Sequence, residues 1–378
     1  MKIIADENII FVEEAFSSLG NVHLYSGREI TNKILKDADV LLVRSVTEVN
    51  ANLLEGTNVK FVGTATIGTD HIDIGYLAEK GICFTDARGC NSDAVAEYVF
   101  TALLNISNEQ KLSLKGKTIG VVGVGNIGSR IVRLAEALGM KVLQNDPPLK
   151  RKTGGEEFLE LKELMDVDII SFHVPLNMQG EDRTYHLFDY EKINALKDGA
   201  IIINASRGPV IENGSLEELI GKKKFTAVLD VWENEPDINM NLLQKIRFGT
   251  PHIAGYSYEG KINGTVMLYN ALCSILNKKT AWIPLIPEAE NSLIRINGNS
   301  TPEKELFNTL EHVYNISRDD KNIRGILNAN NPGKYFDNLR KKYNLRREFP
   351  NYVVDIDPNN EDMASMFRSF RFSVGVNK

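Results

Sequence analysis

The amino-acid sequence predicts an α/β protein with two doubly wound parallel-sheet domains, one flavodoxin-like and one Rossmann-like, and a small C-terminal α+β domain. Short β-rich segments alternate with helical patterns as far as Leu276, which is typical of parallel sheets that carry helices on both faces. The alternation ends at residues 282–291, where two prolines and several turn-forming residues indicate a linker. We therefore expect a third unit beyond that linker.

The predicted strands fall into two groups, separated by a helical stretch at residues 93–106. We expect a first domain of residues 1–92 with 257–282, a second of residues 93–256 and a third of residues 283–378. The first group of strand segments is 1–6, 21–26, 40–45, 60–65 and 82–87, and the second group is 118–123, 141–146, 168–175, 200–207, 225–232 and 247–254.

The C-terminal unit shows signals for strands and helices but little chemistry of its own. A strand is predicted at residues 292–296, and Thr301 with Pro302 indicates a helix start, because threonine caps helices and proline fits their first position. Residues 352–356 and 371–376 are predicted strands that flank a short helix. These elements are few for an independent core, so we expect a second subunit to complete it in a homodimer.

Composition excludes several classes of protein. The chain has 378 residues, 43% hydrophobic and 25% charged, which is average for a globular protein and enough for two or three domains. A net charge of −6 argues against a nucleic-acid partner but not against a small anionic substrate. The three cysteines lack the spacing of a disulfide framework or a zinc site, and no segment resembles a signal peptide or membrane helix. We expect a cytoplasmic protein with no metal and no membrane contact.

A glycine-rich motif follows the predicted strand at residues 118–123. Gly123, Gly125 and Gly128 form GxGxxG between that strand and a helical pattern, which is the context of a dinucleotide-binding loop. The first glycine permits a tight turn, the second lets the backbone approach a pyrophosphate, and the third allows close packing of helix on strand. Such a turn also occurs for packing alone, so a second feature is needed.

Asp146 supplies that feature at the end of the next predicted strand. An acid at this position reaches the ribose hydroxyls of NAD and repels the 2′-phosphate of NADP. The alternative is a turn-forming aspartate before Pro147 and Pro148. Together with the glycines, Asp146 favours NAD as the cofactor.

Arg207, Glu235 and His252 lie at the carboxyl ends of three consecutive predicted strand segments, at the edge where open α/β sheets bind their ligands. An arginine suits bidentate binding of a substrate carboxylate, a histidine accepts a hydroxyl proton, and a glutamate orients that histidine. Each residue alone is more typical of a solvated loop. Their combination beside a nucleotide fold predicts a dehydrogenase that needs no metal.

The segments TIGVVGVGNIG, SFHVPL, INASRGPV, LDVWENEP and TPHIAG resemble, in this order, the motifs of the D-isomer-specific 2-hydroxyacid dehydrogenases. The resemblance implies that Arg207 binds substrate, that His252 transfers the proton and that Glu235 is its acid partner, with Glu233 as the spare acid. It also implies hydride transfer between NAD and C2 of a hydroxy acid. The cofactor contacts that it implies are Gly123, Gly125, Asn126, Ile127, Gly128, Asp146, Val174, Ala205, Ser206, Asp230 and Gly255.

The N-terminal loops and the C-terminal tail resemble one branch of this family, which acts on a small phosphorylated hydroxy acid in the synthesis of pyridoxal phosphate (vitamin B6). This implies substrate contacts from Ser45, Thr66 and Tyr256, and dimerisation through the C-terminal domain. The polar residues at the ends of two predicted strands agree with it, and Arg44 is a further candidate for the phosphate, with Arg346 or Arg347 of the tail.

Two alternatives stay open at this point. The first is another hydroxyacid dehydrogenase, such as a phosphoglycerate enzyme with a regulatory third domain. The second is a non-enzymatic, NAD-sensing binding protein of the corepressor kind. The remaining histidines are expected to be structural: Asp70 and His71 belong to a capped helix start, His173 packs near the cofactor, and His23, His186 and His312 are surface or structural residues.

Overall fold

The structure is a computed structural model that describes residues 1–296, 300–357 and 359–376. It divides into two compact units. Unit 1 comprises Met1–Asn91 and Ser257–Pro287, and unit 2 comprises Ser92–Tyr256 and Glu288–Lys378. Within the described residues, no helix is long and apolar enough to cross a membrane.

Unit 1 is built on a five-stranded parallel sheet in the order β2-β1-β3-β4-β5, as in flavodoxin-like folds. Successive residues of the inner strands are buried on opposite faces: Ala5 packs on the side of α1 and α11, whereas Ile4 packs on the side of α2 to α4. The elements are β1 (Lys2–Asp6), α1 (Val12–Phe16), β2 (Asn21–Tyr25), α2 (Asn32–Leu35), β3 (Val40–Val43), α3 (Ala51–Leu54), β4 (Phe61–Thr64), α4 (Ile74–Glu79), β5 (Cys83–Asp86) and α11 (Tyr258–Ile275).

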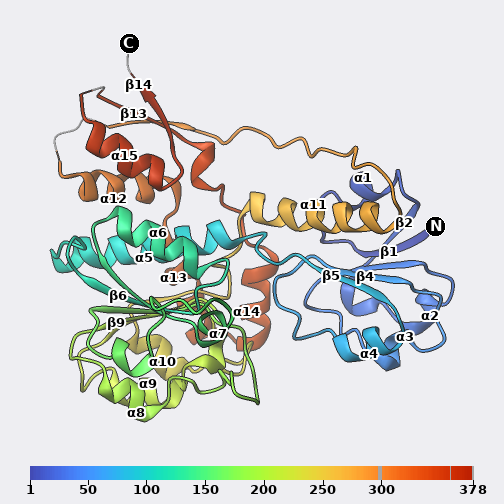
Figure 1. Ribbon diagram of the computed structural model, residues 1–378, viewed down its shortest axis with the longest axis horizontal. Coiled ribbons are helices and arrows are strands. Elements are labelled where there is room, and N and C mark those ends of the chain that lie inside the picture. Colours follow the sequence, from blue (N-terminus) through green and yellow to red (C-terminus); the bar gives the residue numbers. More distant parts are fainter. Residues whose placement is uncertain (297–299, 358, 377–378) are drawn as a thin grey trace. The chain divides into compact units, whose positions relative to one another are not determined.

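Unit 2 contains a six-stranded parallel sheet in the order β11-β10-β9-β8-β6-β7. Phe158 adds an isolated parallel bridge to Gln144 of β7, at the place of a third strand in a Rossmann half. Figure 1 shows α5 and α6 on one face of this sheet and α8, α9 and α10 on the other. The elements are α5 (Ser92–Gln110), β6 (Thr118–Val122), α6 (Gly128–Ala137), β7 (Lys141–Asn145), α7 (Pro147–Thr153), β8 (Ile169–Phe172), α8 (Tyr190–Ala195), β9 (Ile201–Asn204), α9 (Asn213–Leu219), β10 (Thr226–Leu229), α10 (Met240–Lys245) and β11 (Phe248–Gly249).

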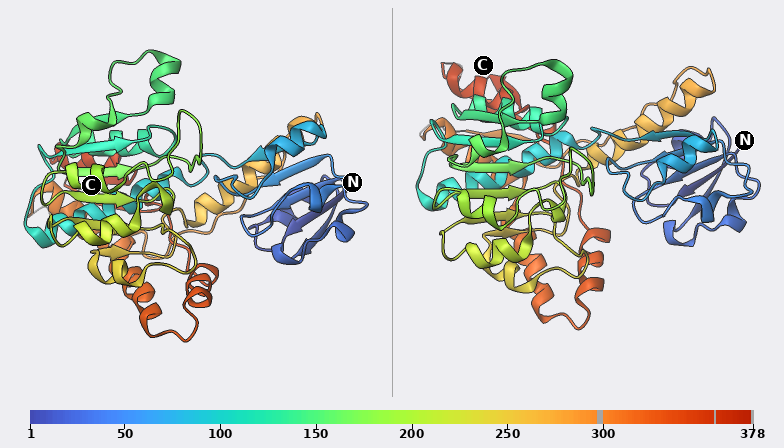
Figure 2. Two further views of the ribbon diagram at one scale, coloured as in Figure 1. Left: turned by 90° about the horizontal axis from the view of Figure 1, so that it is seen from below. Right: turned by 60° about the horizontal axis from the view of Figure 1, so that its bottom comes forward.

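The C-terminal part of unit 2 adds a three-stranded parallel sheet in the order β12-β13-β14 and four helices. In Figure 2 the orange helices α13 and α14 project together from one side of this unit. Thr301 caps α12 by accepting a hydrogen bond from the Lys304 N–H at 3.3 Å, as predicted. The elements are β12 (Leu293–Arg295), α12 (Pro302–Val313), α13 (Ile316–Arg324), α14 (Pro332–Lys341), β13 (Val353–Ile356), α15 (Glu361–Ser369) and β14 (Ser373–Val376).

The core under the C-terminal elements is completed within the same chain. Leu306 of α12 and Phe367 of α15 are fully buried in one cluster with Phe100 of α5. Glu303 accepts hydrogen bonds from the Ser107 hydroxyl at 2.8 Å and from the Leu114 N–H at 3.0 Å. The expectation that a second subunit must complete this core is therefore wrong, because the nucleotide-fold helix α5 supplies the missing face.

All predicted strand segments of both sheets contain a strand, and all pair in parallel. The fold class is confirmed as two parallel-sheet domains plus a small C-terminal three-stranded domain. Helices α13 and α14 were not predicted from the sequence. Local signals exist for both, since Asn315 and Asn331 cap them and Pro332 starts the second.

Candidate active site

The glycine loop after β6 has the shape of a dinucleotide cradle. Gly123 has a positive φ of 85°, and a Cβ there would lie 2.7 Å from the backbone oxygen of His173. A Cβ on Gly128 would lie 2.0 Å from the Gly123 oxygen, so only glycine lets α6 start so close to the strand. A Cβ on Gly125 would meet nothing within 4 Å, so the backbone there is open to a ligand. The loop therefore fits the pyrophosphate of NAD.

Asp146 connects this loop to the end of β7. One carboxylate oxygen accepts a hydrogen bond from the Val124 N–H at 2.8 Å, and the other accepts one from the Leu149 N–H at 2.9 Å. Asp146 is thus the N-cap of α7, so it has the turn-forming role that the sequence offered as the alternative to a ribose contact. A carboxylate has about four lone-pair sites, so ribose hydroxyls can still donate to it, and the predicted NAD contact stays a prediction compatible with the cap.

The segment after β8 lies against the glycine loop. A Cγ atom of Val174 would be 2.7 Å from a Cβ on Gly123. The Nε2 atom of His173 is 2.8 Å from the Ser171 hydroxyl, and burial lowers the pKa of His173 to about 3. The imidazole is therefore neutral at pH 7 and unsuited to cycling a proton, as expected for a packing role.

Arg207 follows β9 in a loop that is held by Asn204. The Asn204 side-chain oxygen Oδ1 accepts hydrogen bonds from the N–H and the hydroxyl of Ser206, at 3.0 and 2.8 Å. The side-chain amide nitrogen of Asn204 donates to the Arg207 backbone oxygen at 2.9 Å. A Cβ on Gly208 would lie 1.9 Å from the Trp232 backbone, so glycine brings the arginine loop into direct contact with the loop that carries Glu235. Ala205 also lies in this loop and is buried.

Glu235 and His252 come together as predicted. The Glu235 carboxylate is 2.8 Å from His252 Nδ1, and its other oxygen accepts a hydrogen bond from the Trp232 N–H at 2.9 Å. Burial tends to raise the pKa of Glu235, but the charge of His252 and their hydrogen bond outweigh this and the pKa is lowered. The carboxylate is thus ionised at pH 7 and can stabilise a protonated imidazole, while it holds the ring with Nε2 available for substrate.

Asp230, at the end of β10, organises the loop that carries His252. It is fully buried, and one oxygen accepts hydrogen bonds from the Thr250 hydroxyl at 2.6 Å and from the Ile253 N–H at 2.7 Å. The other oxygen accepts one from the Ala254 N–H at 2.9 Å. Its backbone oxygen also accepts the His252 N–H at 2.7 Å. Asp230 therefore fixes His252, and its implied contact with the cofactor, like that of Gly255, stays a prediction.

The predicted substrate residues of unit 1 lie at one edge of its sheet. Arg44 and the exposed Ser45 follow β3, and Thr66 follows the neighbouring parallel strand β4. The Thr66 hydroxyl contacts the Thr64 hydroxyl at 2.7 Å and donates to the Gly68 oxygen at 2.9 Å. These residues therefore follow the ends of two neighbouring strands, and their role as substrate contacts stays a prediction.

Tyr256, the fourth predicted substrate residue, lies in unit 2 against the C-terminal segment. Its ring meets the ring of Tyr343 edge-on, with centroids 6.0 Å apart. Arg346 is buried and donates to the backbone oxygens of Ile253, Ala254 and Tyr256. The terminal nitrogens of Arg346 are thus engaged with this loop, and the expected contact between a tail arginine and the substrate phosphate stays a prediction. Arg347 donates to the Asn351 side chain at 2.6 Å.

The other histidines have structural surroundings. His71 is 3.0 Å from the Thr64 hydroxyl, and Asp73, the second acid of the DHID segment, caps α4. His186 pairs with Glu233, the spare acid, at 2.6 Å. His23 and His312 are exposed. Within the residues that the structure describes, no cluster of histidine, cysteine, aspartate and glutamate has the arrangement of a metal site.

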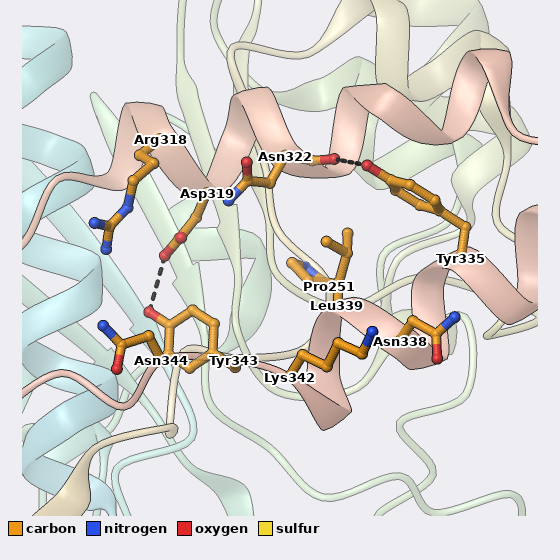
Figure 3. Close-up of a pocket in the computed structure, with 10 residues that line it drawn as sticks. All are labelled: Pro251, Arg318, Asp319, Asn322, Tyr335, Asn338, Leu339, Lys342, Tyr343 and Asn344. Atoms are coloured by element: carbon orange, nitrogen blue, oxygen red, sulfur yellow. Dashed lines mark hydrogen bonds between the residues drawn. The ribbon is translucent and has the colours of Figure 1, made fainter.

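A cavity of about 370 Å³ lies beside α13 and α14 (Figure 3). Tyr343 donates to Asp319 at 2.9 Å, and Tyr335 donates to the Asn322 backbone oxygen at 2.9 Å, so both rings are fixed in its wall. None of the predicted site residues lines this cavity, although Pro251 adjoins His252. The cavity is therefore a feature of the C-terminal segment and not the predicted site itself.

Known families match two parts of the chain. Residues 91–254 match the family described as the NAD binding domain of D-isomer specific 2-hydroxyacid dehydrogenases, and residues 285–369 match a domain of unknown function (DUF3410). Among solved structures, a D-lactate dehydrogenase from Aquifex aeolicus complexed with NAD and lactic acid has a TM-score of 0.61 at 27% identity, covering 73% of this chain and 96% of that one. An NAD⁺-bound 3-phosphoglycerate dehydrogenase from Entamoeba histolytica has a TM-score of 0.62 at 26% identity, with coverages of 73% and 95%. Fold and site thus define an NAD-dependent 2-hydroxyacid dehydrogenase.

Curated relatives narrow this class. Erythronate-4-phosphate dehydrogenase of Photorhabdus laumondii subsp. laumondii is 44% identical over 377 residues, which is 99% of both chains. The enzyme of the same name from Yersinia pestis (strain Pestoides F) is 45% identical over 361 residues, which is 94% of this chain and 95% of that one. The chain belongs to the erythronate-4-phosphate dehydrogenase family.

Proposed function

We propose that the protein oxidises the C2 hydroxyl of 4-phospho-D-erythronate to give 2-oxo-3-hydroxy-4-phosphobutanoate in the synthesis of pyridoxal phosphate. The observation that carries this proposal is the 2.8 Å contact between ionised Glu235 and His252 beside the Arg207 loop, in a chain with relatives of that activity along its whole length. When bound, NAD accepts the hydride that leaves C2.

Each residue of the set has one task in this reaction. Arg207 binds the C1 carboxylate through its planar guanidinium and orients C2. Neutral His252 accepts the hydroxyl proton at Nε2 as the C–H bond breaks, so no charge builds up on the substrate oxygen. Glu235 holds Nδ1 and stabilises the imidazolium that forms. Ser45, Thr66 and Tyr256 are proposed to hold the rest of the substrate.

The experiment that tests this function is a substrate panel with purified protein. Erythronate 4-phosphate, 3-phosphoglycerate, glycerate and lactate are offered with NAD and with NADP, and the product is identified by mass. We expect the highest kcat/KM with erythronate 4-phosphate and NAD. A preference for 3-phosphoglycerate would instead support the phosphoglycerate alternative, and absence of turnover with every substrate would support the binding-protein alternative.

The cofactor preference has its own variant. Replacing Asp146 by alanine removes the ribose contact and the repulsion of a 2′-phosphate, so the NAD to NADP ratio of kcat/KM is expected to fall by about tenfold. The same change removes the N-cap of α7, which costs about 1 kcal/mol of stability. Asp146→Asn keeps the cap and removes the charge, so a loss of preference in both variants would assign the effect to the charge.

Dimerisation and location complete the proposal. Leu293 of β12 and Val353 of β13 are paired in register and both are exposed, and Ile283 and Leu285 are 81% and 85% exposed. Exposed apolar groups of this kind favour an interface, so the C-terminal segment is proposed to form a homodimer. Light scattering of the Leu293→Asp variant should then report monomers.

We also propose that the enzyme is located in the cytoplasm, where an exposed thiol such as that of Cys83 stays reduced.

A further inference from the structure

We propose that Arg340, from the C-terminal helix α14, binds the phosphate end of the substrate and thereby makes the site specific for a phosphorylated acid. This inference rests on the proposed function and adds to it a second cation from the segment that matches a domain of unknown function. Arg207 then binds one anionic end of the substrate and Arg340 the other.

The start of α14 is anchored next to Glu235. A Cβ on Gly333 would lie 2.8 Å from the Asp237 carboxylate and 3.3 Å from Pro236, the residue that follows Glu235. Phe336, one turn further along, is fully buried in the cluster that contains Trp232. The helix therefore packs directly on the loop that carries the glutamate.

The segment after α14 is anchored to Tyr256. The Tyr343 ring packs edge-on against the Tyr256 ring, and Arg346 donates to the Tyr256 backbone oxygen at 3.3 Å and to the Ile253 oxygen at 3.1 Å. Arg340 lies between the two anchors, so the backbone at this position is held beside both Glu235 and Tyr256.

The Arg340 guanidinium is placed among the predicted catalytic and substrate residues and has spare donors. Its side chain hydrogen-bonds the Tyr256 side chain, and its charge interacts with Glu235 and Asp230. The Nε atom is buried and has no hydrogen-bond partner among the described residues. A buried guanidinium donor without a partner is costly, and an incoming anion removes that cost.

Both neighbouring carboxylates accept hydrogen bonds from groups other than Arg340. Glu235 is paired with His252, and both oxygens of Asp230 accept hydrogen bonds from the 250–254 loop. Burial works against the charged form of Arg340, yet Tyr256 and Glu235 outweigh this and raise its pKa, so the guanidinium stays charged. A fixed cation with spare N–H groups suits a phosphate, which offers several oxygens to a planar guanidinium.

The test compares Arg340→Gln and Arg340→Lys with Lys341→Gln, which removes an exposed cation from the same helix. Steady-state kinetics are measured with erythronate 4-phosphate and with unphosphorylated erythronate. We expect kcat/KM for the phosphorylated substrate to fall by about thirtyfold in Arg340→Gln, mainly through KM, and by less in Arg340→Lys. The unphosphorylated substrate should change by less than about threefold, and Lys341→Gln should resemble wild type.

Equal losses on both substrates would overturn the proposal, because Arg340 would then act by positioning Tyr256 or Glu235. Unchanged kinetics would overturn it as well. Thermal unfolding in rising inorganic phosphate gives a readout without turnover: wild type and Lys341→Gln should gain stability and Arg340→Gln should not. If wild type fails to oxidise erythronate 4-phosphate, the proposed function fails. The unfolding measurements in inorganic phosphate still test whether Arg340 binds phosphate. If Arg340→Gln does not fold, Arg340→Lys carries the same comparison.

Discussion

The loop after β10 carries Glu233 and Glu235, and each pairs with a different histidine. Glu235 lies 2.8 Å from Nδ1 of His252, and Glu233 lies 2.6 Å from Nε2 of His186. The histidine side chains are 33% and 25% exposed, so neither distance nor exposure separates the two pairs. They differ in which ring nitrogens are engaged. His186 has carboxylates near both nitrogens, since its Nδ1 is 3.9 Å from Glu212, whereas Glu235 engages only Nδ1 of His252.

Position in the fold separates the pairs further. His252 lies three residues beyond β11, at the edge of the sheet where ligands bind, and Asp230 fixes its backbone. His186 stacks on Tyr185 between β8 and α8, and Glu233 also accepts the Asn213 N–H at 2.8 Å. The comparison teaches that a histidine–glutamate contact alone does not indicate catalysis. The proposed catalytic role of His252 rests on its position at the carboxyl edge of the sheet and on a ring nitrogen, Nε2, that Glu235 does not engage.

The largest effect is expected from His252→Ala. Loss of a general base should lower kcat by about a hundredfold or more, with NAD binding nearly unchanged. The matched variant His186→Ala should change kcat by less than about threefold, because Nε2 of His186 is held by Glu233 and its Nδ1 faces Glu212. Single-turnover assays and NADH fluorescence titrations measure the two quantities. A comparable loss in both variants would break the distinction between the pairs.

Glu235→Gln should produce the next largest effect, about tenfold to thirtyfold in kcat. The amide keeps the ring contact but removes the charge that stabilises the imidazolium, so the acid limb of the kcat–pH profile should move to lower pH. Because the pKa of Glu235 is lowered by folding, the ionised carboxylate also stabilises the native state above its unfolded pKa, and this is lost as pH falls. Glu233→Gln is the control, and an equal shift of its pH profile would contradict the assignment.

Much of this site follows from the sequence because its signals are local. Apolar runs predict the strands, and Arg207, Glu235 and His252 follow three of them, so their meeting at one edge is a consequence of parallel pairing. The roles of Arg340 and Arg346 could not be predicted. They depend on how α14 and the segment after it pack on loops that are distant in the sequence. No sequence pattern indicates which backbone oxygens a guanidinium contacts. The pairing of Glu233 with His186 could not be predicted either, because the two residues lie 47 positions apart in the sequence.

A smaller effect on turnover is expected from Asp230→Asn. This change alters the hydrogen bonds that fix the loop carrying His252. The amide nitrogen cannot accept the hydrogen bond that one Asp230 oxygen now accepts from Ala254 N–H, so a buried donor loses its partner. We expect a loss of about 1–3 kcal/mol in stability and about fivefold in kcat, with the His186 pair unchanged. Urea unfolding and the histidine NMR signals of the two rings measure this. Movement of the His186 signal would show that the pairs are coupled.

The smallest effect on turnover is expected from Asp168→Asn, at the amino end of β8 and far along the sheet from both pairs. Partial burial tends to raise the pKa of Asp168, but hydrogen bonds from the Thr118 N–H and hydroxyl and from Lys197 outweigh this and hold the pKa at about 2. The folded pKa is lowered, so the ionised form contributes stability above the unfolded pKa of about 4, and the contribution is lost as pH falls towards 2. The variant should lose about 1–2 kcal/mol at pH 7 and about half as much at pH 3, with kcat unchanged at both pH values. Urea unfolding at the two pH values measures the stability. A kcat loss in this variant would show that the amino edge of the sheet, and not only its carboxyl edge, sets the geometry of His252.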